Sequence, residues 1–316
     1  MNEMSDVTRA NLDREVRSRM AEDGLLFVGE DLRFIIGSEA STRLQKTNDL
    51  IYVDDRQGIV RVPKDRWNIA QKYEHKTWMT VALEAIDDRN AFHELNFDNY
   101  SSLRGLSFGS AIELGCGPFT NLRLIARKST ISRCTLLDPL VEKYLNHKNC
   151  TFSHGVLKVG DSWLNAVLEK TKGGKAVRRV VRKVSPRLLI RGIPIDRLIS
   201  APIEEITDIG QYDIVVMINV IEHCFDIERI FASIIKVCKK GGLFVFHDRL
   251  YDAQRVKRRA TQHFDAGHPL RVDESIILGF LEANFSKIYE RRTVISDGYK
   301  GIDLSEWGLY FIGSRK

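Results

Sequence analysis

The chain has 316 residues, of which 43% are hydrophobic and 28% are charged, and its formal net charge is +6. This length and apolar content allow a substantial core, in one large domain or two smaller ones. No apolar run reaches about 18 residues, so no membrane-spanning helix is expected, and the polar, acidic first residues do not form a secretory signal.

The five cysteines are scattered and form no Cys-x-x-Cys pair: Cys116, Cys134, Cys150, Cys224 and Cys238. An odd, scattered set argues against a disulfide framework or a structural zinc site. It fits a reducing compartment, and we therefore expect a cytoplasmic protein.

Residues 1–62 are expected to form an N-terminal appendage of helix and short strands. Thr8–Met20 lacks glycine and proline and is rich in arginine and glutamate, which predicts a helix. Asp49–Val53 and Gly58–Val62 flank a polar tetrapeptide and predict a hairpin. The appendage carries no catalytic motif; a dimerisation element, a lid and a plain extension remain open.

A helix is predicted directly after Pro63. Its apolar positions recur at helical spacing and form one stripe: Trp67, Ala70, Tyr73, Trp78, Val81 and Ala85. Such a stripe usually packs on a sheet. The alternative is that Gln71, Glu74 and Trp78 cover a ligand pocket.

Residues 111–122 combine a short apolar run, the turn Gly115-Cys116-Gly117 and a helical pattern. This order predicts a strand, a tight turn and a helix. Glycines adopt backbone angles closed to other residues and let a ligand approach the main chain. A tight turn without a ligand is the alternative.

The same stretch does not match a dinucleotide site. Glu113 would repel a pyrophosphate, but it can accept hydrogen bonds or lie near a cation. The third glycine of the dinucleotide fingerprint is absent as well, because Asn121 and Leu122 occupy that region.

Three later apolar runs also end in polar residues. Thr135–Leu137 ends at Asp138, about 20 residues after the glycines, where nucleoside-binding folds place a ribose-binding acid. The remaining two runs are Tyr212–Val220, with Asn219 followed by Glu222-His223, and Gly242–Phe246, followed by His247-Asp248. Parallel strands bring such ends to one edge of a sheet, where ligands bind.

These motifs resemble those of class I S-adenosylmethionine-dependent methyltransferases. Glu113–Pro118 resembles the first motif, Leu137–Leu140 the acid after strand two, Tyr212–His223 the fourth motif, and Lys239–Gly242 the turn before strand five. The resemblance covers residues 63–316 in the right order. It implies an α/β, Rossmann-like, seven-stranded and mostly parallel sheet, with the last strand antiparallel and helices on both faces.

A finer similarity points to bacterial members found among glycan and surface-polysaccharide enzymes. It rests on Asp138-Pro139-Leu140, on Ser200–Glu205, and on the helix that carries Trp67, Gln71, Glu74 and Trp78. In the related enzymes a similar helix precedes the first motif.

The resemblance implies S-adenosylmethionine as cofactor and S-adenosylhomocysteine as product. The implied cofactor-binding residues are Glu113, Gly115, Cys116, Gly117, Asp138, Pro139, Leu140, Pro202, Ile203, Asn219, Val220 and Trp78. Glu113 suits the ammonium group, directly or through water, and Asp138 suits the ribose hydroxyls. Pro202 departs from the family, which often has an aspartate there, so adenine recognition would fall to backbone groups.

The domain 63–316 contains an insertion at about 150–196, because the best third strand is Arg197–Ser200. Residues 170–191 hold nine lysines and arginines and no acid. A solvated face is one explanation; a basic, helical cap for a phosphorylated acceptor or an acidic membrane surface is the other. Without interleaved aromatics, nucleic acid is disfavoured.

Transfer to a hydroxyl needs a base, and four histidines are candidates: His223, His247, His263 and His268. Any one of them could instead be a structural residue. A mixed group that could hold a divalent cation is also present: His247, Asp248, Asp252, His263, Asp265 and His268. Its spacing matches no known motif.

We therefore predict an O-methyltransferase for a sugar or glycan precursor, nucleotide- or lipid-linked. A methyltransferase for another small molecule or RNA, and a catalytically silent cofactor-binding or scaffold protein, are the alternatives. The sequence leaves the acceptor and the oligomeric state open.

Overall fold

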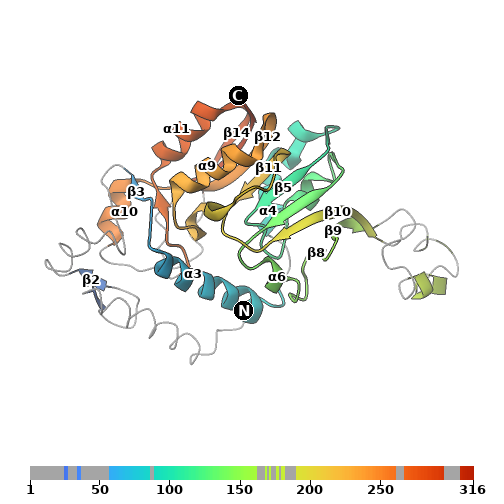
Figure 1. Ribbon diagram of the computed structural model, residues 1–316, viewed down its shortest axis with the longest axis horizontal. Coiled ribbons are helices and arrows are strands. Elements are labelled where there is room, and N and C mark those ends of the chain that lie inside the picture. The colour runs from blue at the N-terminus through green and yellow to red at the C-terminus, as the bar shows by residue number, and fades with distance from the viewer. Residues whose placement is uncertain are drawn as a thin grey trace.

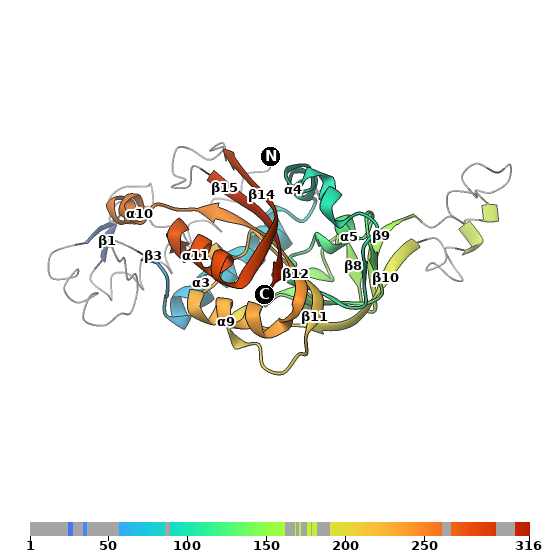
Figure 2. The same ribbon diagram turned by 90° about the horizontal axis from the view of Figure 1, so that it is seen from above.

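A computed structural model describes residues 25–27, 34–36, 57–85, 89–161, 168, 171, 176–177, 179–181, 190–260, 267–294 and 307–316. One large sheet runs through the molecule, with helices packed on both of its faces (Figures 1 and 2).

The sheet has nine described strands in the order β14-β15-β12-β11-β5-β7-β10-β9-β8. Their bounds are β5 Ala111–Leu114, β7 Cys134–Leu137, β8 Phe152–Ser153, β9 Val156–Asp161, β10 Ile190–Ile199, β11 Tyr212–Ile218, β12 Cys238–Leu250, β14 Phe285–Val294 and β15 Trp307–Arg315. Five neighbours, β10, β7, β5, β11 and β12, are mutually parallel.

The last strand, β15, runs antiparallel between β12 and β14. This confirms the expected Rossmann-like sheet, its mostly parallel core and its antiparallel final strand. The sheet is wider than expected, because β9 pairs antiparallel with β10 and β8 pairs antiparallel with β9. The described start of the insertion is therefore strand, although residues 176–177 and 179–181 are helical.

Two hydrophobic cores lie on opposite faces of the sheet. One face is covered by α9 (Ile227–Val237) and α11 (Glu274–Asn284). The other is covered by η2 (Asp98–Leu103), α5 (Leu122–Ile125) and α6 (Val141–Tyr144). Apolar side chains alternate between the two cores along β11, which explains why that strand is apolar throughout.

The helices α9 and α11 each begin at an aspartate that caps the first turn. The carboxylate of Asp226 accepts a hydrogen bond from the Arg229 amide at the start of α9. The carboxylate of Asp273 accepts one from the Ser275 amide at the start of α11. Each interaction satisfies an amide that the first turn of a helix leaves without a backbone partner.

The remaining described elements are short or peripheral. They are β1 Leu25–Phe27, β2 Phe34–Ile36, β3 Gly58–Ile59, α3 Lys64–Lys76, η1 Thr77–Val81, α4 Arg89–Asn96, β4 Ser107–Phe108, β6 Thr130–Ile131, η4 Ile203–Glu205, η5 Ile221–His223, α10 Ala253–Ala260 and β13 Arg271–Val272. No helix among the described residues has the length and apolar character that crossing a membrane requires.

Only part of the predicted appendage can be compared with the structure. Strands β1 and β2 pair with each other, whereas the helix expected over Thr8–Met20 and the first strand of the hairpin lie outside the described residues. The described half of that hairpin, β3, pairs with β13, more than 200 positions further along the chain. Most of the basic segment 170–191 also lies outside the described residues.

Candidate cofactor and acceptor site

The glycine turn after β5 is held by the neighbouring strand. The amides of Gly115 and Cys116 both donate to the carbonyl oxygen of Leu137, at 2.8 and 3.1 Å. Gly115 has a φ of 71°, and a Cβ added there would lie 2.6 Å from the Val220 side chain. Gly115 is therefore required both by its backbone angle and by the close approach of the segment after β11.

Gly117 occupies a different environment. Its φ is 53°, but a Cβ added there would meet nothing within 4 Å. The turn therefore borders open space at Gly117, as a cradle for a ligand would. Cys116 turns its side chain into the core, so it can contribute to a site only through its backbone.

Glu113 is directed into the protein beneath this turn. One carboxylate oxygen accepts from the amide and the side-chain nitrogen of Asn121, at 2.8 and 3.1 Å, and the other accepts from the amide of Leu122 at 3.1 Å. Burial raises the pKa of Glu113 to about 7. The side chain thus ties the end of β5 to the start of α5, and its contact with a cofactor ammonium remains a prediction.

Asp138, at the end of β7, faces the same turn. Its two oxygens accept from the amides of Gly117 at 3.1 Å and Leu140 at 2.8 Å. Burial raises the pKa of Asp138 to about 6. The acid expected to bind ribose therefore lies directly beside the second glycine.

The predicted adenine side lies between the ends of β7 and β10. The Asp138 amide donates to the Ile199 carbonyl at 3.1 Å, and the Ser200 hydroxyl donates to the Pro139 carbonyl at 2.9 Å. Pro139 is half-buried, whereas Pro202 is buried. The Leu140 and Ile203 side chains belong to the two cores, so these two residues offer chiefly their backbones to a ligand.

The end of β11 is tied to β12. Asn219 has a φ of 59°, unusual for a residue other than glycine, and its amide donates to the His247 carbonyl at 2.8 Å. The amides of Val220 and Ile221 donate to one carboxylate oxygen of Asp248, at 3.1 and 2.7 Å. Burial and the neighbouring charge raise the pKa of Asp248. Asp248 is therefore a structural anchor.

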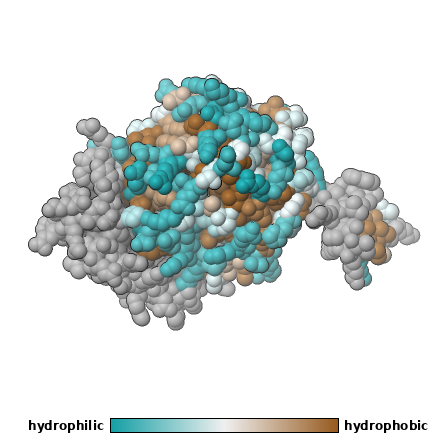
Figure 3. Space-filling view, in the orientation of Figure 1, coloured by the Kyte–Doolittle hydropathy of each residue, from teal (hydrophilic) through white to brown (hydrophobic). Residues whose placement is uncertain are grey.

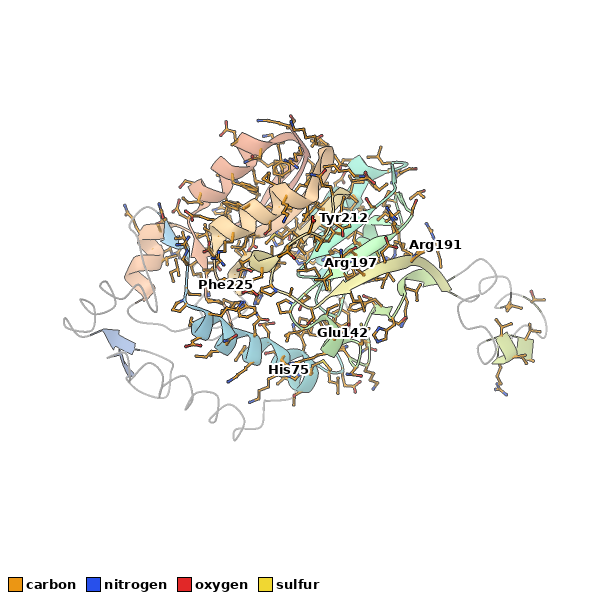
Figure 4. The ribbon with its side chains drawn as sticks, viewed as in Figure 1. His75, Glu142, Arg191, Arg197, Tyr212 and Phe225 are labelled. Carbon is orange, nitrogen blue, oxygen red and sulfur yellow. The ribbon has the colours of Figure 1, made fainter. Side chains whose placement is uncertain are left out.

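Helix α3 crosses this edge of the sheet (Figure 1). The side chains of Trp67 and Gln71 donate to the backbone carbonyl of His223, at 3.1 and 3.2 Å. The Trp67 ring also packs against Phe225, which Figure 4 labels beside this helix, with centroids 5.5 Å apart. The helix is thus fastened to the segment that follows β11.

The far end of α3 and η1 reach the glycine turn. The Trp78 indole donates to a Glu74 carboxylate oxygen at 3.2 Å, and its ring contacts Phe119, two residues after Gly117, at 5.7 Å. The end of this helical segment is thus packed against the glycine turn, and its covering of a ligand pocket by Gln71, Glu74 and Trp78 stays a prediction.

Two of the candidate bases meet in one cluster. The rings of His223 and His268 lie 4.7 Å apart. Nδ1 of His223 lies 3.6 Å from Glu74 Oε1, and the Nε2 atoms of His223 and His268 lie 3.9 and 3.5 Å from Glu222 Oε1. Burial lowers the pKa of His223 and the Glu74 charge opposes this, so at neutral pH this ring can accept a proton.

Glu222 lies buried behind the two histidines, with its side chain 1% exposed. It accepts a hydrogen bond from the Tyr251 hydroxyl at 2.9 Å and lies within 4.0 Å of Arg249 and Arg271. Burial acts to raise the pKa of Glu222, but the charges of His268, Arg249 and Arg271 outweigh it and hold this pKa well below its ordinary value. No local pattern in the sequence links Glu222 to these three partners, because they come from β12, the residue after it and β13.

His247 lies inside the sheet, and its role as a base stays a prediction. Strand β12 continues through this residue, whose ring stacks on Tyr310 at 4.0 Å and whose Nδ1 donates to the Leu309 carbonyl at 2.9 Å. Burial and the nearby His93 lower the pKa of His247. The whole residue is 3% exposed.

The six-residue cation cluster does not form among its described members. His247 is buried in the core, Asp248 accepts backbone hydrogen bonds, and Asp252 is exposed at the start of α10, where it accepts from the Arg255 amide. His263 and Asp265 lie outside the described residues. Within the described part of the chain, the group with metal-ligand geometry is instead Glu74, His223 and His268.

Comparison with known proteins gives one family match. The family described as "Methyltransferase domain" matches residues 88–288, more than half of the chain. The matched stretch includes β5, β7, β11 and β12. No curated protein sequence matches this chain.

Several solved structures are similar at low identity. NodS, an N-methyltransferase from Bradyrhizobium japonicum WM9 solved with S-adenosyl-L-homocysteine, is 13% identical over 79% of this chain and 98% of its own, with a TM-score of 0.45. A Leishmania major S-adenosylmethionine-dependent methyltransferase is 16% identical over 78% of this chain and 82% of its own, with a TM-score of 0.45. The 1,6-didemethyltoxoflavin-N1-methyltransferase of Burkholderia thailandensis is 11% identical over 84% of this chain and 98% of its own, with a TM-score of 0.44.

Proposed function

Since this chain belongs to the family of class I S-adenosylmethionine-dependent methyltransferases, we propose that it methylates a hydroxyl oxygen of a sugar or glycan precursor. The observation that carries the proposal is the meeting of three strand ends at one edge of the sheet. Asp138, after β7, accepts a hydrogen bond from the Gly117 amide in the turn after β5. Gly115 in the same turn packs against Val220, which follows β11. His223 comes three residues after Val220.

The residues present fit the cofactor. Open space at Gly117, the carboxylate of Asp138 and the backbone of Pro139 would receive its nucleoside, and Asn219 would lie near its amino acid part. The bound cofactor supplies a methyl group on a sulfonium, which is activated for in-line displacement. The protein contributes chiefly position, because holding reacting groups in line supplies much of the rate.

The two-histidine cluster supports transfer to oxygen. An alcohol is a poor nucleophile until its proton is shared with a base. His223 and His268 are half-buried, with side chains 21% and 29% exposed, and they stand beside the segment that continues from Asn219. In our proposal one of these rings accepts the acceptor's proton, and Glu222 behind them stabilises the imidazolium that results.

The sugar class of acceptor rests on Asp138-Pro139-Leu140 and on the helical segment formed by α3 and η1, which carries Trp67, Gln71, Glu74 and Trp78. These resemble the glycan-type members, and the side chains of this helix pack over the glycine turn and the segment after β11. We further propose that the basic segment 170–191 attracts the acceptor if it is phosphorylated.

Calorimetric titration with S-adenosylhomocysteine tests the cofactor site. Asp138→Asn removes the negative charge that favours the ribose hydroxyls, and hydrogen bonds to charged groups contribute about 1.5–3 kcal/mol, so Kd should rise about 10- to 100-fold. Glu142→Gln is the matched control, because Glu142 is exposed on α6, as labelled in Figure 4. Equal Kd values for Asp138→Asn and the wild type would remove Asp138 from the site.

The acceptor class needs a separate assay. Labelled S-adenosylmethionine is offered with hydroxylated sugars, nucleotide sugars, other small hydroxylated molecules and RNA. Label is expected in a sugar fraction. Label in RNA alone, or cofactor binding without transfer to any acceptor, would refute the sugar proposal.

A further inference from the structure

The cluster of Glu74, His223 and His268 combines one carboxylate and two imidazoles from three separate segments. Glu74 comes from α3, His223 from η5 and His268 from the loop before β13. One ligand atom from each residue lies within 4.8 Å of the others. We propose that these three residues bind a divalent transition-metal cation, of the Zn²⁺ or Mn²⁺ type, on the acceptor side of the cofactor site.

The chemistry of the donor set points to this class of metal. Imidazole nitrogen suits zinc, copper, iron and nickel, carboxylate oxygen suits manganese, and sets of two histidines with one carboxylate hold zinc and iron in proteins. Magnesium and calcium prefer oxygen ligands throughout. A site with two nitrogen donors therefore selects a transition-type cation over Mg²⁺.

The Gly267 carbonyl gives His223 the orientation that a metal ligand needs. In metal sites one ring nitrogen of a ligating histidine usually donates to a carboxylate or a backbone carbonyl, which fixes the tautomer and raises the basicity of the other nitrogen. Here the Gly267 carbonyl oxygen lies 3.3 Å from Nδ1 of His223, and a carbonyl oxygen only accepts, so Nδ1 is the donor and Nε2 carries the lone pair. Nε2 of His223 and Nε2 of His268 lie 3.9 and 3.5 Å from the same Glu222 oxygen, whose negative charge also attracts a cation.

The surroundings hold the three ligands in place. The Trp78 indole donates to the second oxygen of Glu74 at 3.2 Å, which leaves Oε1 directed toward His223. Tyr251, Arg249 and Arg271 hold Glu222 from behind.

The position of the cluster gives the cation a role. Three protein ligands leave at least one coordination position open, as in catalytic zinc sites. An acceptor hydroxyl bound there would have its pKa lowered and would release its proton to solvent water. This role rests on the proposed transfer to a hydroxyl oxygen and replaces the histidine base, because a ring that binds the cation cannot accept the proton. The binding of the metal itself does not rest on the proposed function.

The first experiment measures metal binding alone. The full chain is freed of metal with a chelator, dialysed and titrated calorimetrically with Zn²⁺, Mn²⁺ and Mg²⁺. We expect one Zn²⁺ or Mn²⁺ per chain and binding of Mg²⁺ at least 100-fold weaker. Glu74→Gln and His268→Ala should each weaken Zn²⁺ binding about 100-fold or more, because even second-sphere changes cost 10- to 100-fold.

The matched control is His154→Ala. His154 is an exposed histidine in the turn between β8 and β9, so its loss should leave the Zn²⁺ affinity unchanged. Co²⁺ loaded into the wild type should absorb in the visible, and this absorption should disappear in His268→Ala. Unchanged Zn²⁺ affinity in Glu74→Gln and His268→Ala, or no binding to the folded wild type, overturns the proposal.

S-adenosylhomocysteine titrations on the same samples separate this proposal from the proposed function. Binding of the nucleoside by every variant shows that each one is folded. If the wild type binds Zn²⁺ but not S-adenosylhomocysteine, the proposed cofactor site is refuted and the metal site stands. If it binds S-adenosylhomocysteine but not Zn²⁺, only the metal site is refuted. Removal of the metal with a chelator should lower the rate of methyl transfer to a hydroxyl acceptor at least 10-fold. If a histidine acts as base without a metal, the chelator should leave this rate unchanged.

Discussion

At the scale of single residues, Glu113 and Asp138 have similar sequence contexts and different roles. Both end a short apolar strand, and burial raises the pKa of both. Asp138 borders the open space at Gly117, whereas Glu113 accepts three hydrogen bonds from Asn121 and Leu122. Glu113 therefore holds the turn against the start of α5, and its contact with a cofactor ammonium stays a prediction.

The raised pKa of Glu113 makes a prediction about stability and pH. Its ordinary value is 4.5 and its value in the fold is about 7. Between these two pH values the unfolded chain has lost the proton and the folded chain still holds it. The free energy of unfolding therefore falls as pH rises through this window.

Glu113→Gln removes this dependence. The wild type should lose stability relative to the variant by up to about 1.4 kcal/mol per pH unit from pH 4.5 to 7, about 3 kcal/mol in all. Urea unfolding across pH 4–8 measures the difference. The free energy of unfolding of Glu142→Gln should change with pH as that of the wild type does. If the free energy of unfolding of Glu113→Gln also changes in this way, Glu113 has no raised pKa.

At the scale of elements, the site is built where loops of different strands touch. Gly115 packs against Val220, so the turn after β5 and the segment after β11 fit together without a side chain between them. Gly117, two residues later, meets no neighbour. Gly115 therefore has a packing role, whereas Gly117 faces the space that a ligand would occupy.

This difference gives a paired prediction. Gly117→Ala should cost about 1–2 kcal/mol, the strain of a side chain in the left-handed region. Gly115→Ala should cost a further 1–3 kcal/mol or so, because the new methyl group overpacks against Val220. Chemical denaturation measures both variants.

A double-mutant cycle checks the mechanism. Val220→Ala in the Gly115→Ala background should recover part of the overpacking cost, and in the Gly117→Ala background it should recover none of it. Additive effects in both backgrounds would mean that the contact between Gly115 and Val220 carries no strain.

At the scale of the whole molecule, the sheet divides into a buried centre and an exposed edge. Strand β11 lies between β5 and β12 and contributes to both cores. The β8–β9 pairing is short and lies at the end of the sheet. The space-filling view shows hydrophilic residues over much of the surface, with hydrophobic residues between them (Figure 3).

Native-state hydrogen exchange should reflect this division. Amides of Ile214–Ile218 should exchange only through global unfolding, whereas amides of β8 and β9 should open locally and exchange at least about 100-fold faster. Mass spectrometry of peptides from the two regions measures the ratio. Equal protection of the two regions would contradict the proposed hierarchy.

Patterns in neighbouring residues were sufficient for most of the fold. The apolar run over β11, the glycine turn and the helix caps at Asp226 and Asp273 depend on contacts within a few residues. Local periodicity and turn chemistry report such contacts directly. The same local patterns predicted that strand ends would deliver Asp138 and Asn219 to one edge.

The length of a strand was harder to predict from the sequence, and β12, which includes His247, is the example. The apolar run that predicts β12 stops at Phe246, which suggested a residue free to act as a base. In the structure β12 pairs with β15 through Leu250, so His247 lies inside the sheet opposite Tyr310. Pairing with a strand more than 60 residues away decides this, and no periodicity within β12 reveals it.

The amino-acid sequence by itself determined the parallel sheet, its glycine turn and the acid beside it, because each of these follows from residues close together in the chain. Only the tertiary structure decided that Glu74, His223 and His268 share one cluster, that Glu222 lies behind it and that Glu113 faces inward. Those outcomes depend on how α3 crosses the end of β11 and how the loop before β13 returns to it. Such contacts join positions far apart in sequence, where local patterns carry no information about which side chains meet.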